Sequence, residues 1–400
     1  MKRNFCFAAA IVAALLVLGF FALPTYVASR GNAVLTTEPY ALNADARRRH
    51  RDLVVADLHA DALLWNRDLL ERGDYGHVDL PRLREGNVAL QVFSTVTKVP
   101  RGWVREDDPD DNADWIGLLA VAQRWPMRTW LSPFERARHQ AARLQDTATR
   151  SGDRLRILRT REDLQALLVA RRRGEDVTGG VLATEGSHAL EGRLENIAAL
   201  HDDGFRMMGL QHFFDNRLGG SLSGESGAGL TPFGRAAVLE MQRLGIVIDV
   251  AHSSPAVVED VLAIGEDPVV VSHTGIYGAC PSARNLSDEQ MQRIAEHGGL
   301  VGIGFWEGAV CDASPAGVVR AIRLAIDLLG EDHVALGSDF DGSIRTHFDA
   351  AQLAILTQEM MNQGFSDSEI EKVMGGNLVA LLGRGLPSAG SPAQTGGNGP

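Results

Sequence analysis

Short apolar runs rich in β-branched residues recur along the chain, and stretches with helical periodicity separate them. Nearly every position within a run is apolar, which is typical of parallel strands covered on both faces. Eight such runs alternating with helices predict an α/β fold of the (β/α)8 barrel type. A doubly wound open sheet is the alternative, but no glycine-rich phosphate loop follows the first run to support it. The predicted strands are 53–58, 88–96, 180–184, 205–210, 246–250, 269–272, 300–305 and 333–337.

One connection between predicted strands is much longer than the others. Residues 99–178, which follow the second strand, are polar and contain three segments with helical periodicity, at 114–124, 133–151 and 161–173. Helical periodicity without a strand pattern predicts a helical insertion that forms an outer subdomain or lid on the barrel.

The N-terminal segment, residues 1–30, differs from the body of the chain. Lys2 and Arg3 precede an apolar run from Phe5 to about Leu23, as in an export signal or a membrane anchor. The run is longer than the usual signal-peptide core, so we expect an uncleaved apolar anchor helix whose basic end stays in the cytoplasm. The body would then face the periplasm or the cell exterior. Cleavage near Ser29 would instead give a secreted protein.

The remainder divides into a folded body and a tail. Residues 31–386 carry all the predicted strands and form the predicted barrel domain, whereas residues 387–400 are rich in Gly, Pro, Ser and Ala and predict a disordered tail. The formal net charge of −12 excludes a phosphate-binding surface of the kind that nucleic-acid partners need. No Cys/His cluster has the spacing of a structural zinc site, so any metal must be bound by histidines and carboxylates.

Polar residues gather where the predicted strands end. Because all strands of such a barrel point their carboxyl ends the same way, these side chains can converge on one pocket. Each has a plainer explanation, such as a helix-capping Asp or a hydrogen-bonded core histidine, but their coincidence at one end of the barrel favours a metal centre. Asp249 is expected to orient a histidine from behind. The candidate ligands are His59, Asp61, Glu185, His252 and His273.

Three imidazoles and two carboxylates exceed what one tetrahedral zinc ion requires, and they suit two divalent ions that share a bridging carboxylate. A carbamylated lysine is another known type of bridge, but Lys98 and Lys372 lie away from the candidate histidines. Glu185 is therefore the predicted bridge. Paired metals of this kind activate water and polarise a carbonyl, so hydrolysis of an amide, an ester or a phosphoester would be feasible.

The order and spacing of these segments resemble the renal/membrane dipeptidase family, a branch of the amidohydrolase-like metal barrels, from about Val54 to Leu382. The resemblance implies two zinc ions, one on His59 and Asp61 and the other on His252 and His273, with Glu185 bridging them. The segments that carry it are 57–61, 185–186, the His212 segment, 249–254, 272–273, 282–285 and 337–342.

The same resemblance implies roles around the metals. His212 would contact the scissile carbonyl or the oxyanion, Arg284 would hold the terminal carboxylate of the dipeptide, and Asp339 would face its amino group and assist proton transfer. It also implies a disulfide between Cys280 and Cys311. The segment around His212 departs from the Thr-His-Asn type of animal members, so the resemblance leaves the side-chain preference of the enzyme open.

The resulting hypothesis is a membrane dipeptidase that cleaves dipeptides with a hydroxide bound between two zinc ions. The alternative is a related two-metal barrel amidohydrolase that acts on N-acyl amino acids or lactams. A binding protein without turnover would be expected to lack a ligand, whereas all five candidates are present. Family members often dimerise, so a homodimer is a further expectation.

Overall fold

Eight parallel strands close into a ring in the computed structural model, which describes residues 2–36, 39–99, 114–265 and 267–390. Neighbouring strands follow the order β2-β1-β9-β8-β7-β6-β5-β4, and a further pairing between β2 and β4 completes the barrel. The predicted (β/α)8 architecture is therefore confirmed. The strands are β1 (Val55–Ala60), β2 (Val88–Val96), β4 (Thr178–Glu185), β5 (Phe205–Gly209), β6 (Val247–Asp249), β7 (Val270–Thr274), β8 (Leu300–Ile303) and β9 (Val334–Leu336).

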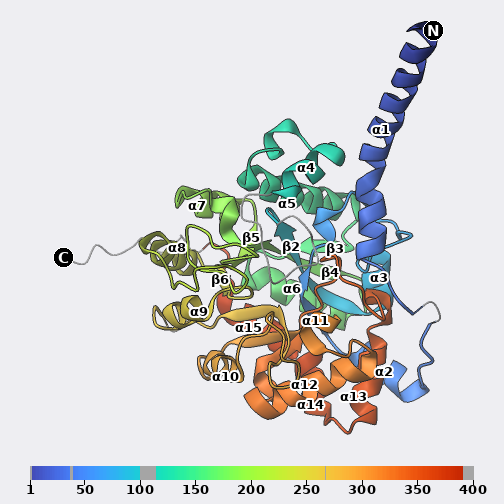
Figure 1. Ribbon diagram of the computed structural model, residues 1–400. Helices are drawn as coiled ribbons and strands as arrows, with labels where there is room; N and C mark the ends of the chain where they lie inside the picture. The colour runs from blue at the N-terminus through green and yellow to red at the C-terminus, as the bar shows by residue number, and fades with distance from the viewer. Residues whose placement is uncertain (1, 37–38, 100–113, 266, 391–400) are drawn as a thin grey trace.

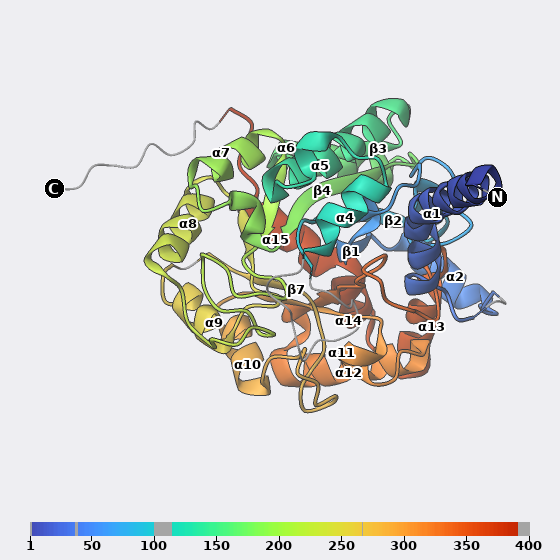
Figure 2. The ribbon, with the colours of Figure 1, turned by 45° about the horizontal axis from the view of Figure 1, so that its top comes forward.

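Helices form an outer ring around the strands (Figures 1 and 2). Several begin with a Ser or Thr N-cap followed directly by proline, as at Thr231-Pro232, Ser254-Pro255 and Ser314-Pro315. The hydroxyl accepts a hydrogen bond from a backbone N–H of the first turn that would otherwise be unpaired. Proline already has the φ angle of a helix, and it has no backbone N–H that needs a partner. The helices outside the insertion and the N-terminal segment are α2 (Ala44–Asp52), α3 (Leu80–Glu85), α7 (Glu195–Asp202), α8 (Pro232–Arg243), α9 (Pro255–Leu262), α10 (Asp288–Glu296), α11 (Glu307–Val310), α12 (Pro315–Leu329), α13 (Ala354–Asn362), α14 (Asp367–Glu371) and α15 (Asn377–Gly385).

Alternation along β1 separates the chemistry from the packing. Ala56 and Leu58 belong to an apolar cluster that also contains Leu378 and Leu381 of α15, so they face the outer helices. Successive side chains of a strand point to opposite faces. Asp57 and His59 therefore face the inside of the ring.

The long connection between β2 and β4 contains the three predicted helices, α4 (Trp115–Ala122), α5 (Pro133–Arg150) and α6 (Arg161–Arg172). It also contains β3 (Leu155–Ile157), which pairs with the start of β4 and was not predicted. α6 packs against β2 and β4, so it lies in the helical layer of the barrel. A lid role for this insertion stays a prediction, and its residues 100–113 lie outside the described part of the chain.

The N-terminal residues form α1 (Lys2–Gly31), whose far end projects away from the body (Figure 1). Its last turns pack on the barrel, where Ala28 is buried in a cluster with Leu64, Trp65 and Val99. The structure does not describe the side chains of residues 2–3 and 8–16. Among the residues that are described, no helix has both the length and the apolar composition of a membrane span. Of the predicted disordered tail, residues 391–400 also lie outside it.

Candidate active site

The predicted ligands and substrate-facing residues all lie at the carboxyl end of the barrel. His59 and Asp61 stand at the end of β1, Glu185 ends β4, His273 lies in β7, and the others follow β5, β6, β7 and β9. All of them are buried. A cavity of about 380 Å³ opens onto this group, and it is lined by Asp61, Glu185, His212, His252, His273, Arg284 and Asp339 among others.

Glu185 occupies the centre of the group. Its Oε1 lies 3.2 Å from Nε2 of His252 and 3.5 Å from Nε2 of His273. The same oxygen lies 3.7 Å from Nε2 of His59 and 3.4 Å from Nε2 of His212. One carboxylate therefore faces four imidazoles from four different strand ends, which is the position that a bridging ligand needs.

Three sets of side chains bring their ligand atoms within 4.8 Å of one another. One is the predicted set of His59, Asp61 and Glu185. The second joins Glu185 and His252 with His212 in place of the predicted His273, and the third joins His273 and His59 with Asp339. The sets share members, so all seven residues form one continuous group rather than two separate ones.

The residues present fit a metal centre. Nε2 of His59 and Oδ1 of Asp61 are fully buried and face each other at 3.4 Å, and neither makes a hydrogen bond of normal geometry to any described residue. Unpaired buried polar atoms are rare in native proteins because each costs free energy of desolvation. A divalent cation would satisfy both atoms at once, and imidazole nitrogens with carboxylate oxygens are the donor set that zinc accepts.

The electrostatics point the same way. Burial disfavours a charged His59, but Asp61, Glu185 and Asp339 outweigh burial and raise its pKa to about 10. Burial, reinforced by Asp61, raises the pKa of Glu185 well above its usual value. Burial and the nearby Arg284 guanidinium hold the pKa of His252 well below its usual value. Three buried carboxylates, those of Asp61, Glu185 and Asp339, thus lie close together, and a bound cation would reduce their mutual repulsion.

Further polar groups contact the candidate ligands on the side away from the cavity. Oγ of Ser272 lies 2.9 Å from Nδ1 of His273 and 3.3 Å from Nδ1 of His59. Nδ1 of His212 lies 3.2 Å from the carbonyl oxygen of Lys98. Sequence reasoning missed both contacts. Conversely, the Oδ1 of Asp249 accepts the backbone amides of Ala251 and Ser272, so the contact described for this carboxylate is with the backbone and not with a histidine.

The Arg284 side chain is 3% exposed and lies against the histidines. Its NH2 donates to the carbonyl oxygen of His273 at 2.8 Å and lies 3.2 Å from Nε2 of His252. The guanidinium also lies over the ring of Trp306, at 5.8 Å from the centroid. These contacts hold a cation at the cavity wall, where a carboxylate could be received.

A disulfide joins Cys280 to Cys311, as predicted, with their Cα atoms 5.5 Å apart. It links the loop after β7, which carries Arg284, to the loop after β8, which carries Trp306. Nδ2 of Asn285 adds a hydrogen bond to the carbonyl of Ala309 at 2.9 Å. Two loops that line the cavity are thereby held together.

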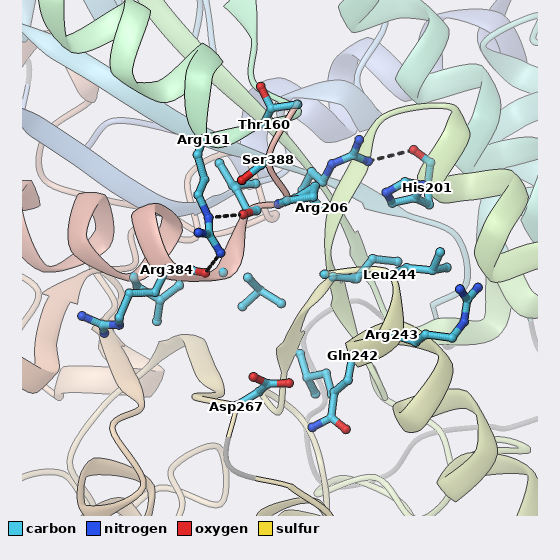
Figure 3. Close-up of a pocket in the computed structure, with 18 of the residues that line it drawn as sticks. Thr160, Arg161, His201, Arg206, Gln242, Arg243, Leu244, Asp267, Arg384 and Ser388 are labelled. Atoms are coloured by element: carbon cyan, nitrogen blue, oxygen red, sulfur yellow. Dashed lines mark hydrogen bonds between the residues drawn. The ribbon is translucent and has the colours of Figure 1, made fainter. Parts of the chain in front are cut away.

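A larger cavity, of about 1120 Å³, lies at the opposite end of the barrel, by the start of β6 (Figure 3). Two of the guanidinium groups that line it are engaged by backbone carbonyls. Arg161 donates to the carbonyl of Leu386 at 2.6 Å, and Arg206 donates to the carbonyl of His201 at 2.8 Å. None of the three sets of ligand atoms lies here, so the carboxyl end of the barrel is the candidate active site.

Comparisons with known proteins agree with this geometry. The dipeptidase aclJ of Aspergillus oryzae is 28% identical over 355 residues, which cover 82% of this chain and 77% of the relative. The crystal structure of the dipeptidase AC, a metallo peptidase of family M19, is 27% identical, with a TM-score of 0.68 over 84% of this chain and 99% of that one.

A metallo peptidase from Rhodobacter sphaeroides, solved with a phosphinate mimic of the dipeptide L-Ala-D-Ala, is also 27% identical. Its TM-score is 0.67, over 84% of this chain and all of that one. Finally, residues 43–384 match the family model for membrane dipeptidases. With most of its length matched, the chain belongs to the membrane dipeptidase family, peptidase family M19.

Proposed function

We propose that this protein is a dipeptidase with two zinc ions, one bound by His59 and Asp61 and the other by His252 and His273. Glu185 bridges them. The observation that carries this proposal is the central position of the Glu185 carboxylate, whose Oε1 faces all four imidazoles within 3.7 Å.

When bound, the metals would supply an activated water and a polarised carbonyl. Side chains of the protein bind the substrate and transfer the proton. Arg284 binds the terminal carboxylate of the dipeptide through its planar guanidinium. His212 lines the cavity at the position assigned to the scissile carbonyl. Its Nδ1 faces the Lys98 carbonyl and therefore carries a hydrogen, so Nε2 can donate to the developing oxyanion only when the ring is protonated. Asp339 lies at the cavity wall and faces the free amino group. Its carboxylate takes up the proton released by the attacking water and passes it to the leaving amine as the C–N bond breaks.

The limit to dipeptides follows from size and charge. The cavity volume of about 380 Å³ is small, and Arg284 occupies its wall as a buried cation. A peptide with a C-terminal extension would place an uncharged amide, and further residues, where the carboxylate belongs. The relative solved with an L-Ala-D-Ala mimic supports a dipeptide as ligand and makes a D-residue at the C-terminal position worth testing.

The proposal is tested by counting metals and measuring turnover on the same sample. The full-length protein would be purified after export, its zinc content measured, and hydrolysis of L,L- and L,D-dipeptides followed before and after chelation. We expect two zinc ions per chain and cleavage that chelation abolishes and zinc restores. Two metals without dipeptide turnover would favour N-acyl amino acids or lactams, and absence of metal would overturn the assigned ligands.

We also propose that the protein is exported, with its N-terminal segment as signal or membrane anchor. Lys2 and Arg3 followed by an apolar run support this, and a disulfide such as Cys280–Cys311 persists in oxidising compartments. Fractionation of cells, with alkaline extraction of the membranes, distinguishes an anchored from a released protein. A homodimer is a further proposal, which light scattering of the purified protein tests.

A further inference from the structure

Residues 32–35, which directly follow α1, lie along the loop that leaves β9. Leu35 donates its amide to the carbonyl of Thr346 at 2.7 Å, and Thr346 donates to the carbonyl of Ala33 at 3.2 Å. Val34 and Thr346 thereby form a parallel bridge. Oδ1 of Asn32 accepts the amide of Ser343 at 2.8 Å. The N-terminal segment is thus attached to the body at a loop, on the side where β9 and β1 meet.

That loop carries Asp339 and then forms one wall of the active-site cavity, through Gly342, Ser343, Ile344, Arg345 and His347. Its backbone is unusual, because Asp339, Asp341 and Ser343 all have positive φ. Non-glycine residues adopt this conformation at a cost, so surrounding contacts have to maintain it. His77 and Val78 donate their amides to the Asp341 carboxylate, and Asn32 accepts the amide of Ser343.

Leu35 itself lines the cavity. Leu35 is 45% exposed, and its amide is held by the hydrogen bond to the carbonyl of Thr346. Leu64 and Ile344, which come from the β1 and β9 loops, line the same cavity. Arg284 follows β7, which is separated from β9 by β8. Leu35, Leu64 and Ile344 therefore form an apolar part of the wall in a different sector of the barrel from Arg284.

We propose that Leu35 contacts the side chain of the N-terminal residue of the dipeptide and favours substrates in which that side chain is apolar. The inference rests on the proposed function, since it takes Arg284 as the carboxylate clamp and Asp339 as the group facing the amino end. A dipeptide held at those two points directs the side chain next to its amino group toward the loop after β9. Leu35 is the residue that the N-terminal segment contributes there.

Two isomeric substrates test this inference in the full-length enzyme. Leu35→Ala should lower kcat/KM for Leu-Gly by about tenfold, which is what loss of one apolar contact costs, and leave Gly-Leu nearly unchanged. Leu35→Met, which keeps an apolar side chain, should behave like the wild type. Leu239→Ala serves as the matched control, because Leu239 is a half-exposed leucine of α8 outside this cavity.

The outcomes distinguish a failure of the proposed dipeptidase function from a failure of the role inferred for Leu35. If the wild type cleaves neither dipeptide, the proposed function fails. If the wild type cleaves both and Leu35→Ala alters neither, or lowers both equally, Leu35 does not read the N-terminal side chain and the inference is overturned. A selective loss for Leu-Gly, absent from the Leu239 variant, supports it.

Discussion

The hydroxyl of Ser272 lies 2.9 Å from Nδ1 of His273. The same oxygen lies 3.3 Å from Nδ1 of His59, so one side chain supports two histidines that we assign to different metals. A partner on the second ring nitrogen fixes the orientation of a metal-binding histidine.

We expect Ser272→Ala to weaken zinc binding by about tenfold to a hundredfold, measured by competition with a chelator. Ser94→Ala is the matched control, because Ser94 is equally buried on β2 and its hydroxyl makes no hydrogen bond to the described residues. Equal zinc affinities of the two variants would show that Ser272 does not support zinc binding.

Replacing the central carboxylate tests the bridge. Glu185→Gln keeps the volume of the side chain but supplies a neutral amide between two cations. We expect fewer than two zinc ions per chain by elemental analysis and a loss of dipeptide hydrolysis of about a thousandfold or more. A variant that retains both metals and most of its turnover would show that Glu185 is not the bridge.

Arg284→Lys tests the carboxylate clamp. Lysine keeps the charge but cannot form two parallel hydrogen bonds to a carboxylate. We expect KM for dipeptides to rise by about tenfold to a hundredfold, with zinc content unchanged. Dipeptide amides, which lack the terminal carboxylate, should be poor substrates for the wild type and lose little in the variant. Unchanged dipeptide kinetics would contradict the assignment.

The Cys280–Cys311 bridge should contribute to stability by restricting the unfolded chain. It joins two cysteines with a sequence separation of 31, and a native disulfide of this kind contributes about 2–4 kcal/mol to the free energy of unfolding. The double variant Cys280→Ser/Cys311→Ser should therefore unfold at lower urea concentration than the wild type. Reductant should destabilise the wild type and leave the variant unaffected, and an equal response of both proteins would contradict this account.

His188 should make stability depend on pH. Burial, with a contribution from Lys98, lowers its pKa to about 3, and neither ring nitrogen has a hydrogen-bond partner among the described residues. The unfolded chain binds the proton more readily than the folded one, so this stability is complete above about pH 6.5 and is lost as the pH falls toward 3. We expect the wild type to lose about 1 kcal/mol more than His188→Leu between about pH 7.5 and about pH 5.5. Urea unfolding of both proteins at both pH values measures the difference, and parallel losses would contradict the prediction.

The barrel was predictable because buried parallel strands are almost continuously apolar, and all eight predicted runs are found as strands. β3 was missed because it has three residues, Leu155, Arg156 and Ile157, with a charged one in the middle. Such a short, mixed segment has no periodicity to detect. The helices of the insertion were predicted closely because their apolar spacing is regular.

The candidate site was predictable for a topological reason. His59 and Asp339 are far apart in sequence, but strand ends of a closed ring meet, and their ligand atoms lie 4.0 Å apart. The supporting contacts were not predictable. The partner of His212 is the backbone carbonyl of Lys98, and every residue type has such a carbonyl, so the sequence does not single it out. Leu35 reaches the cavity only because residues 32–35 pair with a loop from the other end of the chain.

The pairing of β2 with β4 closes the ring, and the proposed ligands are spread around it, on β1, β4, β7 and the loop after β6. No contiguous half of the chain contains the whole set. A nascent chain therefore has no complete coordination sphere until β7 has been synthesised, and the ligands of β1 and β7 come together only when the strands have assembled into the ring. Metal uptake should therefore come late in folding. A chain that retains two zinc ions would be one in which the strands that carry the ligands have assembled correctly.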